Sequence, residues 1–410
     1  MRYISEPREK TIDRLRVIFF MLMLVDHTLH GYAQYWGSFW FVHDVDRSLL
    51  CDVLYLHNNS VIIPMLFFVS GFCVYGSLMR WGLCAYMWRR ACYLLGTAVA
   101  GVIFLVPWMA YGKFVLEASV SLSFYDFLTT QFFTGAKLQA GPMWVLYAIF
   151  LYGSMAAGGL VLMGKVRTQR LGQVIARLIA AHPWCSLATV MGVCAILLGV
   201  MDIRYGAPWW IGGWKVFHFQ GSRFLVQALF FAIGVGASLI PEADRVILMG
   251  RLMHALPVLM CGLFGVGVLY IGYAMLWYSE GAYSSDLYYY YNGYIPQGSP
   301  MEIITAIAPG ILIRTSLHGI FLPLQIVCYG GLVYRFCSLS WMVIDYWKDK
   351  TLGLFLYHPI FVIGGQVLLY GYDIPVIVKI ILVVTGSYVG TLGLTLATRR
   401  IFSRLTSAFS

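Results

Sequence analysis

Residues 12 to 30 of the chain read IDRLRVIFFMLMLVDHTLH, an apolar run that begins beside Arg16 and closes on Asp26, His27 and His30. About twenty apolar residues are enough to carry a helix across the hydrocarbon core of a bilayer. The run has a basic start, but it contains ionisable residues and no small-residue cleavage site follows it, unlike a secretory signal peptide. We therefore expect it to stay in the mature protein as the first of several membrane spans.

The overall composition points the same way. The chain has 410 residues, of which 60% are hydrophobic and 11% are charged, whereas charged residues make up roughly a quarter of an average soluble domain. The net charge of +10 comes from basic residues at the margins of apolar runs, not from basic patches beside polar surface. This argues against a water-soluble enzyme and against a nucleic-acid partner, and makes the lipid bilayer the first expected partner.

Hydropathy predicts an all-α, polytopic membrane protein with about ten transmembrane helices. The spans are expected near residues 15–36, 61–79, 91–110, 143–164, 184–201, 222–240, 254–278, 315–335, 351–370 and 375–398. With the N-terminus inside, about twenty basic residues fall in the inner segments and few fall outside, so the positive-inside rule puts both termini in the cytoplasm. No long polar linker or internal repeat divides the spans, and residues 1–410 are expected to form a single domain.

The ionisable residues inside the first span are the strongest functional signal, because each costs about 2.5 to 3.5 kcal/mol at the centre of a membrane helix. His27 follows Arg16 by eleven residues, which puts the two within about 20° of one helix face and roughly 16 Å apart along the axis. The plainer alternative is that Arg16 anchors the helix at the cytoplasmic surface and the histidines hydrogen-bond to neighbouring helices. Asp26 points about 100° away from His27, so we expect it to pair with another helix or bind an incoming polar group.

Five motifs resemble those of the membrane-bound acyltransferase 3 family, in order, spacing and predicted side of the membrane. The first is IDRLRVIFFMLMLVDH, in which an Asp and an Arg precede a His eleven residues after the Arg. The others are FFVSGF at Phe67 to Phe72, the adjacent Arg89 and Arg90, GPMW at Gly141 to Trp144, and GLFLYHPIF at Gly353 to Phe361. The family often has a second arginine about three positions beyond the first in the basic loop, where this chain has Tyr93.

The resemblance implies acyl transfer from cytoplasmic acyl-CoA, acetyl-CoA before succinyl-CoA, to a hydroxyl of an exported glycan at the bacterial inner membrane. By position in the motif His27 is the catalytic base, a role for which histidine has a suitable pKa, and Asp26 and His358 are further catalytic candidates. The phosphates of the donor suit guanidinium groups. The expected donor-site residues are Arg16, Arg89, Arg90 and Ser70.

Aromatic external segments suggest the acceptor. The loops near 202–221 and 279–302 are nearly uncharged and rich in Trp and Tyr, which suits stacking on sugar faces, although an interfacial aromatic belt would look similar. We expect a neutral polysaccharide such as cellulose or a periplasmic glucan, with a polysaccharide synthase, a secretion complex or a periplasmic acyl-transfer protein as further partners. The candidate acceptor-binding residues are His30, Trp144, Trp210, Trp214, Tyr290 and His318.

Two other classes of function stay open. The first is a proton-coupled transporter or flippase in which Asp26, His27 and His30 relay protons. The second is a non-catalytic partner within a secretion complex. The scattered histidines have no clustered carboxylate or cysteine neighbours, so no metal site is predicted. Phosphate-binding loops and serine-hydrolase motifs do not occur in the sequence.

Overall fold

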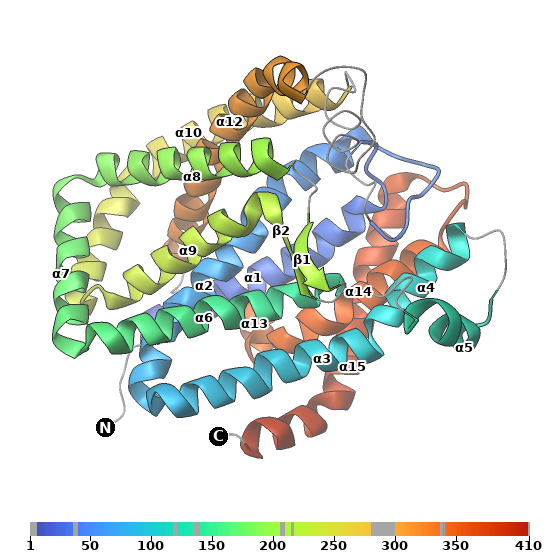
Figure 1. The fold of residues 1–410 in the computed structure, drawn as a ribbon, viewed down its shortest axis with the longest axis horizontal. Coiled ribbons are helices and arrows are strands. Elements are labelled where there is room, and N and C mark those ends of the chain that lie inside the picture. Colours follow the sequence, from blue (N-terminus) through green and yellow to red (C-terminus); the bar gives the residue numbers. More distant parts are fainter. Residues whose placement is uncertain are drawn as a thin grey trace.

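The computed structural model describes residues 6–35, 40–117, 122–134, 140–205, 210–214, 217–279, 300–336, 339 and 341–408. Most of them lie in long helices (Figure 1). The α-helices are α1 Glu6–His30, α2 Leu49–Arg90, α3 Gly96–Phe104, α4 Val106–Glu117, α5 Phe124–Phe127, α6 Trp144–Met163, α7 Lys165–Ala181, α8 Pro183–Tyr205, α9 Gly221–Leu239, α10 Glu242–Ser279, α12 Pro300–Arg335, α13 Met342–Trp347, α14 Thr351–Leu368 and α15 Val376–Ala408. Short π-helical turns span Ala91–Leu95 and Leu128–Phe132, and 3₁₀ turns span Gly141–Met143 and Lys348–Lys350.

Within the described residues, 8 helical segments are long and apolar enough to cross a membrane. The predicted class, a polytopic helical membrane protein, is confirmed in this form. One element departs from the all-α prediction, because the segment before α9 forms an antiparallel hairpin of β1, Trp210–Trp214, and β2, Phe217–Gln220.

Helix ends differ from the hydropathy prediction, and both shorter and longer helices occur. The first helix ends at His30 instead of near residue 36, because the chain turns at Gly31 and Tyr32. Other helices begin earlier than predicted: α2 starts at Leu49 and α10 at Glu242. Hydropathy detects the lipid-facing part of a helix, while the backbone hydrogen bonds continue into its polar ends.

The longest apolar segment, Leu49–Leu116, contains a reversal of the chain. Gly82 adopts φ 74° and ψ 169° inside α2, a conformation that only glycine adopts without strain. Figure 1 shows the chain turning there, at the lower left, and running back through α3 and α4. The segment thus forms two antiparallel arms.

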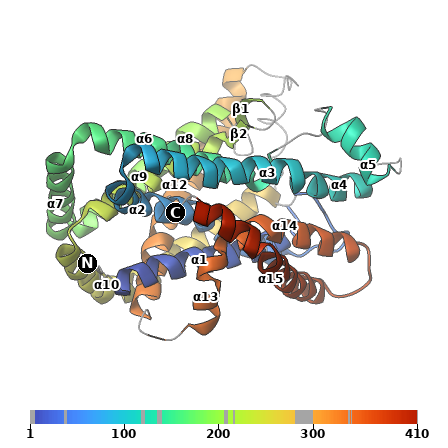
Figure 2. The same cartoon turned by 90° about the horizontal axis from the view of Figure 1, so that it is seen from below.

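The core of the molecule packs α1 between α2 and α14, and α2 against α9 (Figures 1 and 2). The contact between α2 and α9 is made at glycines on both helices. A Cβ added to Gly71 would overlap the Phe231 carbonyl, and one added to Gly234 would overlap the Phe68 carbonyl. Small residues of this kind let two membrane helices approach closely.

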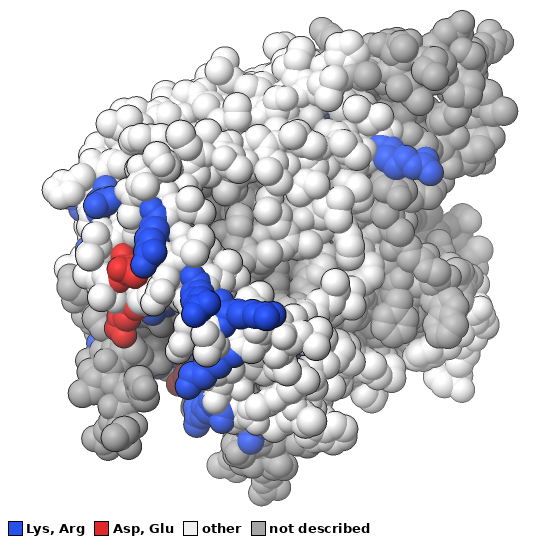
Figure 3. Space-filling view, turned by 60° about the vertical axis from the view of Figure 1, so that its left-hand side comes forward, with Lys and Arg blue, Asp and Glu red and all other residues white. Residues whose placement is uncertain are grey.

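Basic side chains collect at one end of the molecule. The helix α7 crosses the ends of α6 and α8 at the left of Figure 1, and Figure 3 shows Lys and Arg gathered at this end beside a broad uncharged surface. The exposed members in the described residues include Arg80, Lys165, Arg167, Arg170, Arg177, Arg251 and Arg335. The first turn of α1 and the last turns of α15 lie at the same end (Figure 1).

Candidate functional site

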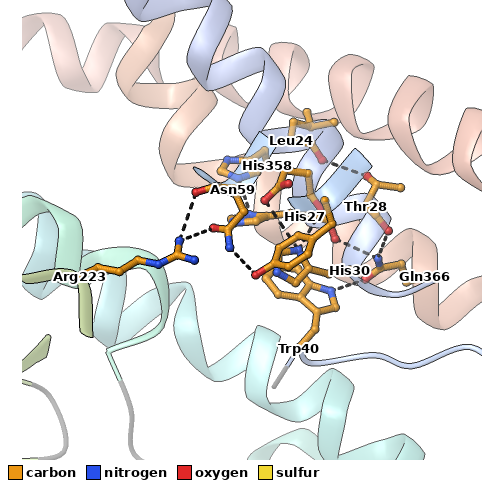
Figure 4. A network of polar contacts seen from close by, with 11 residues as sticks. Leu24, His27, Thr28, His30, Trp40, Asn59, Arg223, His358 and Gln366 are labelled. Atoms are coloured by element: carbon orange, nitrogen blue, oxygen red, sulfur yellow. Dashed lines mark hydrogen bonds and ion pairs between the residues drawn. The ribbon is translucent and has the colours of Figure 1, made fainter. Parts of the chain in front are cut away.

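Two histidines from opposite ends of the chain meet between α1 and α14. His358 Nε2 lies 3.0 Å from His27 Nδ1, and the two rings stack with centroids 5.0 Å apart and planes inclined by 23°. His358 is fully buried, whereas His27 is partly exposed. Figure 4 shows both rings within one network of polar contacts.

The hydrogen bonds of this pair determine where its protons are. His358 Nδ1 lies 2.7 Å from the carbonyl oxygen of Leu354, and a carbonyl only accepts, so this nitrogen donates. In the neutral ring Nε2 is then an acceptor, and the bond from His27 must be donated by Nδ1–H. A neutral His27 therefore keeps its lone pair on Nε2, for which the described residues supply no hydrogen bond.

A tryptophan and a glutamine hold the end of α1 that carries His27 and His30. The Trp40 ring lies 4.6 Å from His27 and 5.0 Å from His30, centroid to centroid. Trp40 Nε1 donates to Gln366 Oε1 at 2.8 Å, and Gln366 Nε2 donates to the carbonyl oxygens of His27 at 3.2 Å and Thr28 at 3.0 Å. Two of the last carbonyls of α1 are thus satisfied by a side chain from α14, which fixes the helix end beside the histidines.

Asp26 associates with His30 and not with His27, in line with the expected direction of its side chain. His30 Nδ1 donates to the Asp26 carbonyl oxygen at 2.9 Å, and Asp26 Oδ2 lies 3.8 Å from the same nitrogen. The other carboxylate oxygen, Oδ1, is buried and has no hydrogen-bond partner in the described part of the chain. The expected pairing of Asp26 with another helix is not formed there.

Arg223 and Asn59 also belong to this network, and sequence reasoning missed both. Arg223 Nη1, at the start of α9, donates to Asn59 Oδ1 at 3.1 Å and to the Asn59 carbonyl oxygen at 3.2 Å. Asn59 Nδ2 donates to the Tyr55 hydroxyl, whose ring packs edge-on against His30 at 4.3 Å. The sequence held a sign of Arg223, because it is a basic residue at the start of a predicted span, on the side where the predicted topology places few basic residues.

Arg16 of α1 and Arg90 of α2 both lie within electrostatic range of the Tyr93 hydroxyl, and the Arg90 guanidinium lies over the Tyr86 ring, 5.4 Å from its centroid. Arg16 donates to Asp13 Oδ1 at 2.9 Å and to the Lys348 carbonyl oxygen at 3.4 Å, and its Nε is buried without a partner in the described residues. The Arg89 guanidinium lies over the Trp81 ring, 4.7 Å from its centroid.

His318 lies in a second polar cluster, between α8, α10 and α12. Its ring stacks on Tyr270 with centroids 4.9 Å apart, and its Nε2 is buried without a partner in the described residues. One turn away, Arg314 pairs with Asp202. The structure does not join this cluster to the histidine pair by hydrogen bonds between described residues, but Arg223 lies within electrostatic range of both His318 and Asp26.

The remaining predicted site residues do not join the histidine network in what the structure describes. Ser70 is half-buried near the close contact of α2 with α9, and Trp144 is buried in the main apolar core. Trp210 and Trp214 lie in β1, but their side chains are outside the described part. Tyr290 lies outside the described residues.

Among the described residues no group of three or more His, Cys, Asp or Glu side chains could hold a metal ion. The described cysteines are free thiols. The chemistry that the network offers is therefore an imidazole with an open nitrogen, a buried carboxylate oxygen and a guanidinium.

Comparison with family models, curated proteins and solved structures finds no match for this chain.

Proposed function

We propose that this protein is a membrane O-acyltransferase that moves an acetyl group from cytoplasmic acetyl-CoA to a hydroxyl of an exported polysaccharide. The observation that carries the proposal is the chain of hydrogen bonds from Leu354 through His358 to His27. It leaves the outward nitrogen of His27 as a base on the same helix as Arg16. The motifs shared with membrane-bound acyltransferases support the same reading.

In direct transfer, His27 Nε2 removes the hydroxyl proton as the oxygen attacks the thioester carbonyl. The carbon–sulfur bond then breaks, and the departing thiolate takes the proton from the imidazolium to give coenzyme A. In the covalent route, Nε2 itself attacks the thioester carbonyl, and the carbon–sulfur bond breaks to leave an acetyl-imidazolium and the coenzyme A thiolate. The hydroxyl then attacks the acetyl group, the carbon–nitrogen bond breaks to restore the imidazole, and the hydroxyl proton goes to the thiolate. Both routes need an unprotonated Nε2, and His358 holds the tautomer that provides it.

The inner end supplies groups suited to the donor. The Nε of Arg16 has no hydrogen-bond partner in the described residues. Both Arg16 and Arg90 lie within electrostatic range of the Tyr93 hydroxyl. Guanidiniums bind phosphate oxygens through charge-assisted hydrogen bonds, so we assign the diphosphate of coenzyme A to this pair. Arg89, which is not among the arginines within electrostatic range of Tyr93, has a smaller part in this site.

We further propose ten membrane crossings with both termini in the cytoplasm of a bacterial cell. The eight apolar segments become ten when the two arms of Leu49–Leu116 are counted separately and α1 is added. The collection of basic residues at the end that holds α7, the start of α1 and the last turns of α15 supports this orientation (Figure 3). The site at His27 then lies between a cytoplasmic donor and an external acceptor.

The test is mass spectrometry of the exported glycans from cells with and without the protein, together with thermal unfolding of the purified protein in acetyl-CoA. Acetyl esters that disappear with the protein, and a rise in unfolding temperature that Arg90→Ala weakens, are expected. Unchanged glycans and no stabilisation by acetyl-CoA would contradict the proposal and favour a transporter that uses Asp26, His27 and His30 as a proton relay.

A further inference from the structure

Asp26 and Arg223, an acidic and a basic side chain, lie near the histidine pair but do not bond to each other. They lie within electrostatic range, yet the contacts of the described residues include no ion pair between them. Asp26 is 4% exposed and its Oδ1 has no partner there. An unpaired buried carboxylate oxygen costs free energy unless something else satisfies it.

Arg223 is held in place while part of its guanidinium stays available. Its hydrogen bonds to described residues are made by Nη1 alone, to the side chain and the backbone of Asn59. The side chain is half-buried, and Figure 4 shows it extending toward the labelled residues of the histidine network. Nη2 and Nε can therefore donate to a ligand that binds beside Arg223.

The ligand that fits both residues is a neutral hydroxyl compound. A carboxylate or phosphate would be attracted by Arg223 but repelled by the ionised form of Asp26. A protonated amine would be attracted by that form of Asp26 but repelled by Arg223. A sugar hydroxyl both donates and accepts, so it satisfies the carboxylate oxygen and the guanidinium together.

We propose that Asp26 and Arg223 form a binding subsite for a second hydroxyl of the acceptor, and that this subsite selects neutral sugars over charged ones. The inference rests on the proposed function, since the reacting hydroxyl would lie at His27. Asn59 and Tyr55 act as positioning residues, because Asn59 accepts from Arg223 and donates to the Tyr55 hydroxyl beside His30.

The experiment measures binding of three soluble probes to the full-length protein in detergent without acetyl-CoA. The probes are cellotetraose, which is neutral, an anionic galacturonic acid oligomer and a cationic glucosamine oligomer. The wild type should prefer cellotetraose, and Arg223→Met and Asp26→Asn should each weaken its binding about tenfold to a hundredfold, as expected for a lost charge-assisted hydrogen bond.

The two variants should also shift selectivity in opposite directions. Asp26→Asn leaves a net positive subsite and should improve binding of the galacturonic acid oligomer, whereas Arg223→Met should improve binding of the glucosamine oligomer. Arg204→Met, which changes an exposed arginine near the same end, is the control and should bind all three probes as the wild type does. If Arg223→Met does not fold, Arg223→Lys takes its place and should retain charge selectivity with weaker affinity.

The proposal is overturned if the wild type binds the three probes equally or not at all, or if the variants leave the preference unchanged. A separate measurement, release of coenzyme A from acetyl-CoA by wild-type membranes that contain the exported glycan, distinguishes this failure from failure of the proposed function. Coenzyme A release with unaltered sugar binding in the variants would contradict only the subsite. Absence of release would contradict the acyltransferase.

Discussion

His27 Nδ1 and His358 Nε2 form a hydrogen bond of 3.0 Å although 331 residues separate them in the chain. The bond makes His358 a positioning residue that acts through His27. In His358→Gln the side-chain oxygen can still accept from Nδ1–H, so much of the acetyl transfer should remain. In His358→Ala no acceptor remains, and the turnover number should fall about a hundredfold or more, as when other catalytic histidines lose their orienting partner.

Steady-state transfer kinetics check this comparison, with acetyl-CoA binding as the control for folding. A merely structural role would lower transfer equally in both variants. Equal losses in His358→Gln and His358→Ala would therefore contradict the tautomer argument.

The donor site predicts different effects at adjacent arginines. Arg90→Ala and Arg16→Ala should raise the KM for acetyl-CoA about tenfold to a hundredfold, because each removes a charge-assisted contact to phosphate. Arg89→Ala should change it far less, since Arg16 and Arg90, and not Arg89, lie within electrostatic range of Tyr93. Titration with acetyl-CoA at saturating acceptor measures the difference, and an Arg89 effect larger than that of Arg90 would refute the assignment.

The close contact of α2 and α9 predicts that alanine substitutions at two glycines of α2 have different effects on stability. Gly71→Ala places a Cβ against the Phe231 carbonyl and should destabilise the protein by about 1 to 3 kcal/mol, the usual cost of overpacking. Gly76→Ala, five residues later in the same helix, has open space around it and should leave stability unchanged or slightly raised. Thermal unfolding in detergent compares the two, and equal unfolding temperatures would contradict the packing described here.

A buried ion pair fixes the segment between α1 and α2 that carries Trp40. Lys379 at the start of α15 is fully buried and lies 2.9 Å from both Asp44 Oδ1 and Asp46 Oδ2. Lys379→Met should destabilise the protein by about 3 to 5 kcal/mol, because it leaves the buried Asp44 uncompensated. Adding Asp44→Asn should recover part of that loss.

The exposed Lys165→Met is the matched control for this change and should have little effect on unfolding. A double variant whose loss equals the sum of the two single losses would show that Lys379 and Asp44 do not depend on each other.

Local patterns in the sequence were enough to find the apolar spans and the face of α1 that carries Arg16 and His27. They could not find Gln366 or Arg223 as members of the site, because these reach His27 and His30 only through the packing of helices distant in the chain. Trp40 was missed because the segment after α1 folds back onto His27. The adjacent Arg89 and Arg90 looked equivalent in the sequence, but in the structure Arg89 lies over Trp81 and Arg90 over Tyr86.

The role of His27 as the base for transmembrane acetyl transfer can be measured in membrane vesicles. Radiolabelled acetyl-CoA is added to the cytoplasmic face, and label is counted in external glucan. With wild-type protein and His27→Ala at equal abundance, we expect labelling by the variant to be about a hundredfold to ten-thousandfold lower, the usual contribution of a general base. Labelling of the glucan by His27→Ala at close to the wild-type rate would contradict this role.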